Sequence, residues 1–403
     1  MKKGFAIAVL ALCGAASTAG RAHAQDAKPT FDIYGFGQAD AIVDIEQNNP
    51  DWYDVNRPSK LPKFTKEFGQ DGHFYLSPRQ SRFGAKGVLP TSDGDVTAVF
   101  EFDMFGVGPD AGQTTIRLRH AWGQWKQIGG GQTNSAFMDV DVFPNVLDYW
   151  GPNGMLFFRN TQIFWEPFND GKSNARIAFE APGASGDAGV LTDRIELQNV
   201  KARFPAPDLT GHYRFGRDWG YLQVGGALRY IAWDDLLPND PFSLSGHVWG
   251  WGVSVSSRVN VGANDVLHLQ GIVGRGVENY FNDAPVDVGV ERNPGNTVTP
   301  VTGEPLRDIG LVFYLDHTWN SRWSSSVGYS RVNIDNSDLQ APTAFRTGQY
   351  STANLICTPV KNVMMGAEFQ WARRRNFSDG FSVDDYRVQM SVKYNFSYHV
   401  GEN

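Results

Sequence analysis

The chain has 403 residues and a formal net charge of −7, from 36 basic and 43 acidic residues. This acidic balance argues against a basic surface for binding nucleic acid. Aromatic residues make up 13% of the chain and glycine occurs 44 times, and few helical patterns are visible, so the composition favours an all-β protein. Beyond the amino-terminal segment, no apolar run is long enough for a membrane-spanning helix.

The amino-terminal segment carries the features of a secretory signal peptide. Two lysines stand near its start, an apolar run covers residues 4–17, and Ala22–Ala24 forms an A-x-A cleavage motif. We therefore expect residues 1–24 to be removed on export and residues 25–403 to form one β-barrel domain. Removal takes away three basic residues and no acid, which leaves a charge of −10, and it leaves Cys357 without a partner for an intramolecular disulfide.

Segments of alternating apolar and polar residues recur along the rest of the chain, as expected of strands with one apolar face. Sixteen are predicted, at residues 30–45, 74–87, 94–106, 114–126, 128–137, 155–166, 173–182, 207–216, 220–234, 244–261, 265–280, 305–320, 322–335, 349–359, 363–376 and 386–396. Every second connection is short and turn-rich, such as PTSDGD, whereas the others are mostly longer. This alternation predicts a transmembrane, antiparallel, up-and-down β-barrel of about 16 strands, with turns in the periplasm and loops outside.

The stretch TTIRLRHAWGQW indicates which face of such a strand meets water. Arg117 and Arg119 alternate with Ile116, Leu118 and Trp122, and successive side chains of a strand point to opposite faces. An arginine on the lipid face at mid-depth would cost roughly 2–4 kcal/mol. We therefore expect the arginines in a water-filled lumen and the three apolar residues outside.

The same alternation selects further charged residues for the lumen. The predicted pore-lining set is Arg82, Lys86, Arg117, Arg119, Arg176, Arg214 and Arg229, with the acids Glu101 and Asp103. A predominantly basic wall of this kind would influence which ions pass. The alternative for each residue is a hydrated wall charge that pairs across strands and takes no part in selection.

The connection MDVDVFPNVLDYWGPNG, residues 138–154, is unusually apolar and aromatic for an exposed loop. Such a loop needs a surface to pack on, and folding into the barrel supplies one. We expect it to narrow the lumen, with its acids facing the basic wall. The residues assigned to this constriction loop are Asp139, Asp141, Asp148, Tyr149 and Trp150. The alternative is a loop that caps the barrel outside or packs on a neighbouring subunit.

The first and last strands suggest assembly and insertion into the membrane. The first strand places Gly35, Gly37, Ala39 and Ala41 on its outward face, and small residues there suit contact with another subunit. His120 and Gln124 are also expected to point outward, towards such an interface. The last strand, RVQMSVKYNF, carries apolar residues on one face up to Phe396 and is similar to the insertion signal of outer-membrane proteins, although SYHVGEN follows it.

Other functions find less support in the sequence. The histidines after residue 24 lie in no G-x-S-x-G, H-E-x-x-H or cysteine-pair context, so neither an enzyme nor a cofactor or metal site is predicted. A plugged barrel that acts as a surface binding or adhesion protein is the main alternative, and a soluble periplasmic β-protein is another. Arg373–Arg375 permit surface binding, but contact with anionic lipopolysaccharide or a solvated loop base also explains them.

Several motifs resemble those of outer-membrane porins, namely YGFGQAD, RQSRFGAKG and RLRHAWGQW. Two later stretches, RFPAPDLTGHYRF and NVMMGAEFQWARRRNFSDG, narrow the resemblance to DcaP-like porins. It covers nearly all of the chain after residue 24. It implies a homotrimer of sixteen-stranded barrels in the outer membrane and passive diffusion of small anionic solutes, dicarboxylates among them. By match to the porin pattern, Arg82 takes the position of a constriction arginine, Arg117 and Arg119 fall in the RLRHA strand, and Asp139 ends the piece that opens the inward loop.

Overall fold

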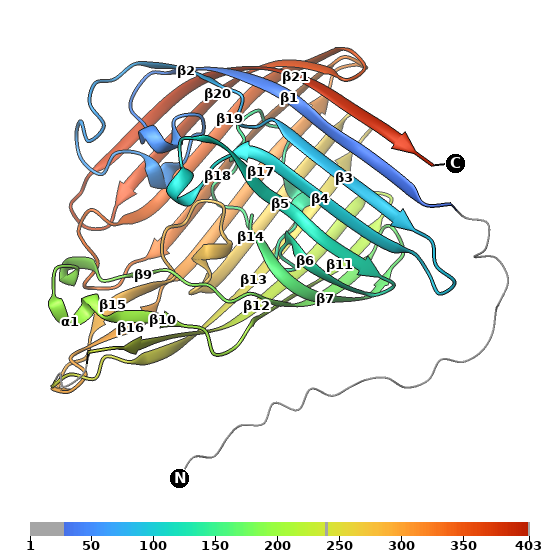
Figure 1. Cartoon of the computed structure of the whole chain (residues 1–403). Helices are drawn as coiled ribbons and strands as arrows, with labels where there is room; N and C mark the ends of the chain where they lie inside the picture. Colours follow the sequence, from blue (N-terminus) through green and yellow to red (C-terminus); the bar gives the residue numbers. More distant parts are fainter. Residues whose placement is uncertain (1–27, 238–240, 402–403) are drawn as a thin grey trace.

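A computed structural model describes residues 28–237 and 241–401, so the predicted signal peptide lies outside the described residues. One large antiparallel sheet forms the wall of a barrel (Figure 1). Its strands are β1 (Thr30–Asp44), β2 (His73–Ser77), β3 (Arg82–Leu89), β4 (Val96–Phe105), β5 (Thr114–Trp125), β6 (Ile128–Asn134), β7 (Arg159–Asn169), β8 (Asn174–Glu180), β11 (Asp208–Arg217), β12 (Gly220–Asp235), β13 (Gly246–Val261), β14 (Asp265–Arg275), β17 (Arg307–Thr318), β18 (Trp323–Asp335), β19 (Phe345–Val360), β20 (Val363–Asn376) and β21 (Ser382–Val400). Because β2 and β3 both pair with β1 and follow one another along it, the wall has sixteen strands, as predicted.

The barrel closes between its first and last strands. β1 pairs with β21 from Phe31↔Val400 to Asp44↔Arg387. The predicted last strand ended at Phe396, but β21 continues through Ser397–Val400, which pair with the beginning of β1. Closure satisfies the backbone groups that an open sheet edge would leave unpaired in lipid. The residues that follow the terminal aromatic motif are therefore part of the wall.

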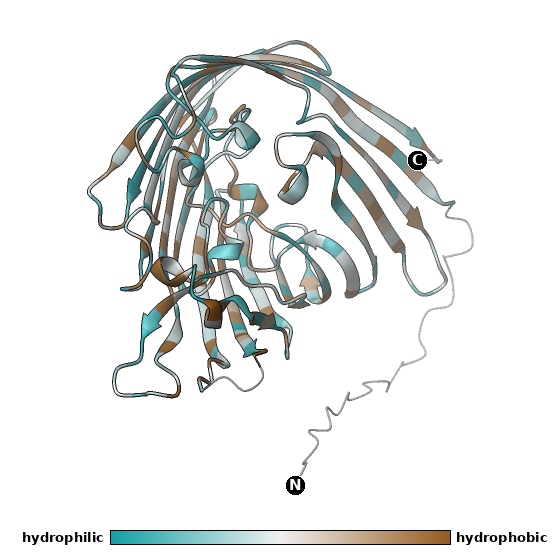
Figure 2. Cartoon of the chain, turned by 60° about the vertical axis from the view of Figure 1, so that its left-hand side comes forward, coloured by the Kyte–Doolittle hydropathy of each residue, from teal (hydrophilic) through white to brown (hydrophobic). Residues whose placement is uncertain are grey.

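Hydrophobic and hydrophilic residues alternate along strands of the wall (Figure 2). In β20, for example, Phe369 points outward and is 47% exposed, whereas the neighbouring Glu368 points inward and is 1% exposed. This is the alternation expected where lipid surrounds the strands. No helix among the described residues is long and apolar enough to cross a membrane.

One β-bulge corrects the predicted orientation within β5. Glu101 pairs with His120, but the next residue of β4, Phe102, pairs with Leu118, so the bulge adds one residue to β5. A bulge reverses the alternation beyond it. Arg117 and Leu118 therefore face as predicted, but His120, Trp122 and Gln124 point into the lumen and not outward. Trp122 packs inside against Phe164, with 6.2 Å between ring centroids.

The connections differ at the two ends of the barrel. Short turns join the strands at the end where both termini lie, and long loops gather at the opposite end (Figure 1). The loops contain β9 (Gly186–Asp187), β10 (Val200–Arg203), β15 (Val288–Arg292), β16 (Val301–Pro305), α1 (Ile195–Gln198) and the 3-10 helices η1 (Pro50–Trp52), η2 (Pro58–Lys60), η3 (Gly108–Asp110), η4 (Val140–Val142), η5 (Gly189–Leu191) and η6 (Glu278–Tyr280). β9, β15 and β16 form a small separate sheet, and β10 extends the wall beside β12. None of these loop elements was predicted.

The hydrophobic core lies inside the barrel, where inserted loops meet the wall. One cluster surrounds Phe137 and Leu156, on either side of the long connection after β6, together with Tyr280 from η6. A second cluster joins Leu61 and Val142 to wall residues of β17, β19 and β20. Phe137 also packs over Gly252, where a side chain would collide with its ring. These contacts fix the inserted loops and so set the shape of the lumen.

Candidate functional site

Residues 138–154 lie inside the barrel, as predicted for a constriction loop. Their backbone is held by side chains on the wall: Glu368 of β20 accepts from Leu147 N at 2.8 Å, and Asn354 of β19 donates to Asn145 O at 2.8 Å. Ser330 of β18 accepts from Gly154 N at 2.8 Å. A loop buried in a barrel needs partners for its backbone groups, and inward-facing polar residues of three neighbouring strands supply them.

Asp148 anchors the same loop through its carboxyl group. It accepts hydrogen bonds from Tyr350 Oη at 2.8 Å and from the backbone N–H of Asn56 and Trp150 at 3.3 and 3.2 Å. Burial, and next the nearby Glu368 carboxyl group, raises the pKa of Asp148 from its ordinary 3.8 to about 7. Asp148 thus faces β19 and β20, on the side of the loop away from the arginines of β5, and does not face the basic wall across water as expected.

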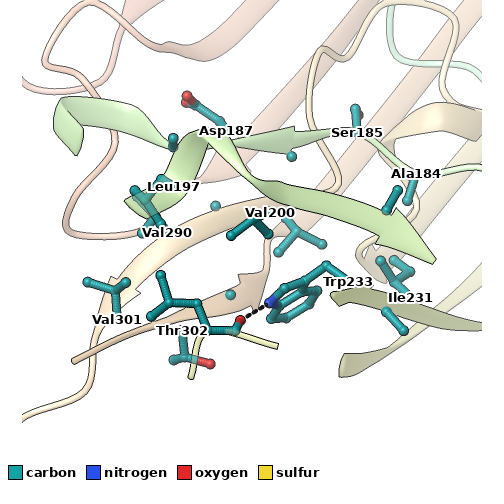
Figure 3. A pocket seen from close by; sticks show the side chains of 18 residues that line it. Ala184, Ser185, Asp187, Leu197, Val200, Ile231, Trp233, Val290, Val301 and Thr302 are labelled. Carbon is teal, nitrogen blue, oxygen red and sulfur yellow. Dashed lines mark hydrogen bonds between the residues drawn. The ribbon is translucent and has the colours of Figure 1, made fainter. Parts of the chain in front are cut away.

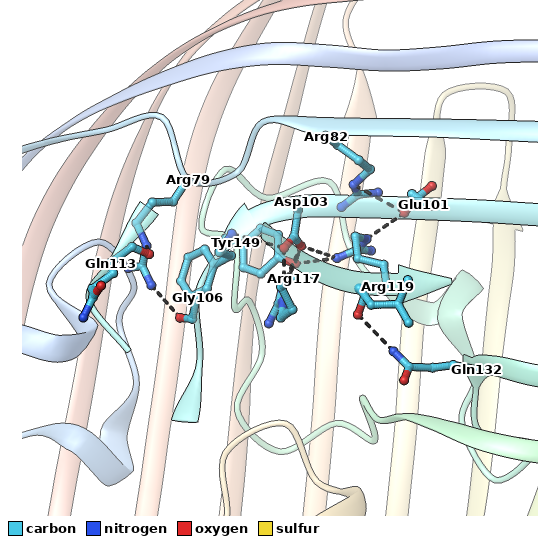
Figure 4. Close-up of polar contacts among 12 residues, drawn as sticks. Arg79, Arg82, Glu101, Asp103, Gly106, Gln113, Arg117, Arg119, Gln132 and Tyr149 are labelled. Carbon is cyan, nitrogen blue, oxygen red and sulfur yellow. Dashed lines mark hydrogen bonds and ion pairs between the residues drawn. The ribbon is translucent and has the colours of Figure 1, made fainter. Parts of the chain in front are cut away.

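Tyr149 connects the loop to the predicted arginines (Figure 4). Its hydroxyl accepts from both Arg117 and Arg119 and donates to Asp103 at 2.5 Å. Arg117 also binds Asp103 through two hydrogen bonds of 2.7 and 3.0 Å, and Arg119 reaches Glu101 at 2.7 Å and Asp103 at 3.0 Å. The structure thus brings these predicted residues together as a paired network, and the pairing balances most of the positive charge of β5.

Two more predicted arginines hold loops. Arg214 pairs with Asp139 at 2.7 Å and with Asp141, while Asp139 also accepts from Tyr221 at 2.8 Å. Arg229 is 1% exposed, so it does not line open space. It pairs with Asp208 at 2.9 Å on its own wall and with Asp287 at 2.7 Å in the long connection between β14 and β17.

A cavity of ≈ 420 Å³ opens beside the loop towards the turn end of the barrel. Polar and charged side chains that line it are Tyr34, Glu101, His120, Asp141, Glu166, Arg176, His212 and Arg214. Arg176 is paired with Glu166 at 2.8 Å. Arg82 reaches Glu101 only at 3.6 Å. Further along the same strand Lys86 faces the lumen, and no ion pair is described for it.

A second cavity of ≈ 420 Å³ lies on the other side of Tyr149, towards the loop end. Its lining combines Arg117 and Arg159 with the aromatic side chains Trp52, Tyr149, Trp150, Phe157 and Phe158. Arg159 Nη1 is buried and has no hydrogen-bond partner among the described residues, and the guanidinium lies 5.2 Å from the ring of Phe157. Arg159 is thus the candidate anion-binding residue that sequence reasoning missed.

A gap in the wall explains why the alternation of residues did not predict Arg159 as a lumen residue. Pairing between β5 and β6 begins only at Ala121↔Gln132, so Thr114–His120 lack a strand on that side. Gln132 Nε2 bridges the gap to Leu118 O at 2.9 Å (Figure 4). Alternation along β7 assigns Arg159 to the outward face together with Ile163 and Trp165, but the gap lets its side chain reach the inner cavity. The missing strand pairing could not be inferred from the alternation.

Three inserted loops meet at the mouth of this cavity. The Arg57 guanidinium lies 4.2 Å from the ring centroids of both Trp52 and Trp150, and it pairs with Asp283 at 2.9 Å. Asp283 also accepts from Ser59 N at 2.8 Å. The predicted loop residue Trp150 is therefore held by the connection between β1 and β2, through Arg57, and by the connection between β14 and β17, where its Nε1 donates to Asn282 O at 2.6 Å.

A third cavity, of ≈ 290 Å³, lies outside the lumen among the outer loops (Figure 3). Val200, Ile231, Val290 and Val301 give it mostly apolar walls, and Trp233 Nε1 donates to Leu244 O at 2.7 Å beside it. It has no place in a conduction path. Among residues 28–237 and 241–401, no group of three or more histidine, cysteine or acidic side chains could hold a metal ion.

Comparisons with known proteins agree with this architecture. The outer membrane channel DcaP of Acinetobacter baumannii has a TM-score of 0.73 and 21% identity, over 91% of this chain and 97% of that one. An anion-selective porin from Comamonas acidovorans has a TM-score of 0.55 and 11% identity, over 92% of this chain and 100% of that one. The outer-membrane protein OmpT of Vibrio cholerae, known in a trimer form, has a TM-score of 0.53 and 11% identity, over 91% of this chain and 99% of that one.

At these identities the solved structures establish the barrel fold and nothing finer. No curated protein matches the sequence significantly. The sequence profile of the family described as DcaP outer membrane protein matches residues 15–283, which is more than half of the chain. The chain therefore belongs to the DcaP outer membrane protein family, and it is an outer-membrane protein.

Proposed function

We propose that the channel lets small hydrophilic anionic solutes, dicarboxylates among them, diffuse passively through a water-filled pore, without a cofactor. The charge balance along the lumen carries this proposal. Among the described residues, no ion pair is found for Arg159, or for Lys86 and Lys393, whose strands place them on the lumen side, whereas Glu101 and Asp103 are already bound by arginines. The charge left without an acidic partner at these three positions is positive, and a positive lining favours anions.

The residues proposed to line the pore and select solutes are those predicted from the sequence, with one residue added and one removed. They are Arg82, Lys86, Arg117, Arg119, Arg176, Arg214 and Arg159, with Glu101 and Asp103 as partners of the arginines. Asp139, Asp141, Asp148, Tyr149 and Trp150 narrow the lumen from the loop. Arg229 is removed from this set, because it is buried between two aspartates.

We further infer that residues 1–24 direct export, that residues 25–403 form the barrel domain, and that the channel is a homotrimer. The outward face of β1 supports the trimer, because Gly37 and Ala39 are small and exposed there. An added Cβ at Gly37 would meet nothing within 4 Å, so this part of the face is bare in one protomer. The remaining outer wall would contact membrane lipid and lipopolysaccharide.

The experiment that tests the pore is the zero-current potential of purified protein in a planar bilayer under a salt gradient. A stable channel with anion preference is the expected result. A stable channel with cation preference would support a pore but contradict the proposal that it favours anionic solutes. The acids of residues 138–154 would then be the candidates for ion selection. The permeabilities of succinate and of a monocarboxylate of similar size, compared under the same gradient, test whether the channel passes dicarboxylates.

A plugged barrel that binds ligands at the cell surface is the second candidate. It is favoured by the inserted loops, which fill part of the lumen with two hydrophobic clusters. The two candidates differ in conductance, because a plugged barrel passes no steady current. The absence of any channel from correctly folded protein would therefore favour surface binding.

A further inference from the structure

Three arginines gather on the outer surface of the wall at the loop end of neighbouring strands. Arg331 on β18 pairs across the sheet with Gln349 on β19, which pairs in turn with Arg373 on β20. Arg375 lies two residues further along β20 on the same face. The middle residue of the triplet, Arg374, points inward, is buried, and donates to Ser59 O at 2.7 Å. The outward cluster thus contains two residues of the triplet and one from another strand.

These three arginines lack strong acidic partners within the protein. No ion pair or hydrogen bond of the Arg331 or Arg375 side chain is found among the described residues. Arg373 comes no closer than 3.9 Å to Asp384, which accepts the Trp371 Nε1 hydrogen bond at 3.0 Å. Outward arginines on β14 and β17 are different, since Arg275 pairs with Glu304 and Arg307 with Asp335. The cluster therefore carries surplus positive charge on the outside of the barrel.

The register of the strands gives the depth of the cluster in the membrane. Two residues closer to the turn end, Tyr329, Trp371 and Tyr386 form a row of outward aromatic side chains around the same strands. Two residues cover roughly 7 Å along a strand. Tyrosine and tryptophan mark the boundary between hydrocarbon and headgroups. The arginines therefore lie at headgroup depth, on the side of the membrane where the long loops are.

We propose that Arg331, Arg373 and Arg375 bind phosphate groups of a phosphorylated glycolipid in the outer leaflet. A guanidinium group presents a planar fork of donors that matches phosphate oxygens, and it remains charged at any physiological pH. β18 and β20 are two strand spacings apart, about 10 Å, so arginines from both strands can reach one headgroup. Gln349 lies between them and offers a neutral amide to the sugar or phosphate oxygens. The site is independent of the solute pathway, because its side chains lie on the other face of the wall.

Native mass spectrometry of the full-length mature protein tests the site. The probes are a diphosphorylated lipid A-type glycolipid and the same glycolipid without phosphates, each added to protein in zwitterionic detergent. The test variant is R331Q/R373Q/R375Q. The matched control is R217Q/R322Q/K361Q, which removes three charges at the opposite end of the barrel. Heat-modifiable migration on gels establishes that both variants fold.

We expect the wild type and the control to retain the diphosphorylated glycolipid at least tenfold better than the test variant. We also expect the phosphate-free glycolipid to bind weakly to all three proteins and added salt to weaken binding to the wild type. Equal binding of both glycolipids to the wild type would overturn the proposal, even if the test variant failed to fold. Retention by the folded test variant would overturn it as well. We expect the channel conductance of the variants to equal that of the wild type. A failure of the glycolipid proposal can therefore be distinguished from a failure of the proposed pore function.

Discussion

Arg117 and Arg159 line the same cavity but differ in how their charges are balanced. Arg117 is bound by Asp103 and Tyr149, whereas Arg159 has an unpartnered Nη1 and lies over the ring of Phe157. A paired arginine adds little net potential, because the carboxylate beside it cancels most of its field. An unpaired guanidinium beside a cavity keeps its full charge available to a solute. The two residues therefore have different roles, and substitutions separate them.

The variant Arg159→Gln is expected to lose anion preference while keeping its stability. A unit charge about 7 Å from a permeating anion in water contributes roughly 0.6 kcal/mol, which is about threefold in local anion concentration. Local cation concentration rises by the same factor when the charge is removed, so we expect the anion-to-cation permeability ratio to fall about sevenfold in zero-current measurements. Arg322→Gln, on an exposed turn outside the lumen, is the control. An unchanged ratio in Arg159→Gln would show that permeating ions do not approach this residue.

The variant Arg117→Gln is expected to lose stability. It removes two charge-assisted hydrogen bonds to Asp103, which is fully buried. A buried group that loses such partners costs about 1–3 kcal/mol. Because Arg119 and Tyr149 still contact Asp103, the loss stays within this range. Thermal unfolding in detergent measures the effect. A melting temperature equal to that of the wild type would contradict the structural role of the pair.

At the scale of elements, the constriction loop is a buried segment whose position depends on wall side chains. Glu368 accepts from Leu147 N and Asp148 N, and it also binds Asn354 at 2.9 Å. These contacts hold the middle of the loop against β19 and β20, far along the chain from β6 and β7, where it begins and ends. The open cross-section of the pore is therefore set by contacts between elements distant in sequence.

Removing this anchor is expected to widen the pore. Glu368→Ala leaves two buried N–H groups without acceptors, at about 1–3 kcal/mol each. The loop then leaves its place on the wall part of the time. We expect higher single-channel conductance and more current noise than in the wild type. Glu368→Gln, which keeps an acceptor oxygen, serves as the control. Its conductance and current noise should lie between those of the wild type and Glu368→Ala. Wild-type conductance and noise in Glu368→Ala would show that other contacts suffice to fix the loop.

The anchoring of the loop is expected to depend on pH through Asp148, whose pKa is raised to about 7. An acid with a raised pKa in the folded state stabilises that state while it stays protonated. The contribution is complete below the unfolded pKa near 4 and is lost as the pH rises through about 7. We therefore expect thermal stability to fall between pH 5 and 8 more in the wild type than in Asp148→Asn. If thermal stability changes with pH equally in the two proteins, Asp148 is not the source of the pH dependence.

At the scale of the whole molecule, the outward face of β1 is the surface that we assign to contact between protomers. If Ala39 lies in that interface, Ala39→Trp disrupts close packing and converts trimers to monomers. If Ala39 faces lipid, tryptophan is tolerated and the oligomeric state does not change. Light scattering of the detergent-solubilised protein distinguishes the two outcomes. Leu311→Trp, on the outward face of β17, is the control and should leave the trimer intact.

Much of the barrel followed from local patterns. Alternation of apolar and polar residues gave all sixteen wall strands to within a few residues at most of their ends, because lipid outside and water inside impose the same two-residue period on every strand. The two ends of β21 beyond residues 386–396 and the loop elements β9, β10, β15 and β16 were not predicted. Ser397–Val400 pair with β1 only because the barrel closes. β9, β15 and β16 pair with each other, and β10 pairs with β12 of the wall.

The candidate site was predicted in part. The sequence by itself determined which residues of β3–β5 carry charge into the lumen, and the aromatic composition of residues 138–154 predicted that they fold inward. Tertiary structure decided how these charges pair, because pairing depends on distances across the lumen that alternation does not report. It also decided the orientation of His120 and Trp122, through a one-residue bulge, and the position of Arg159, through a gap between strands. Charge alternation fixes the face of a regular strand, but bulges and gaps depend on the neighbouring strands.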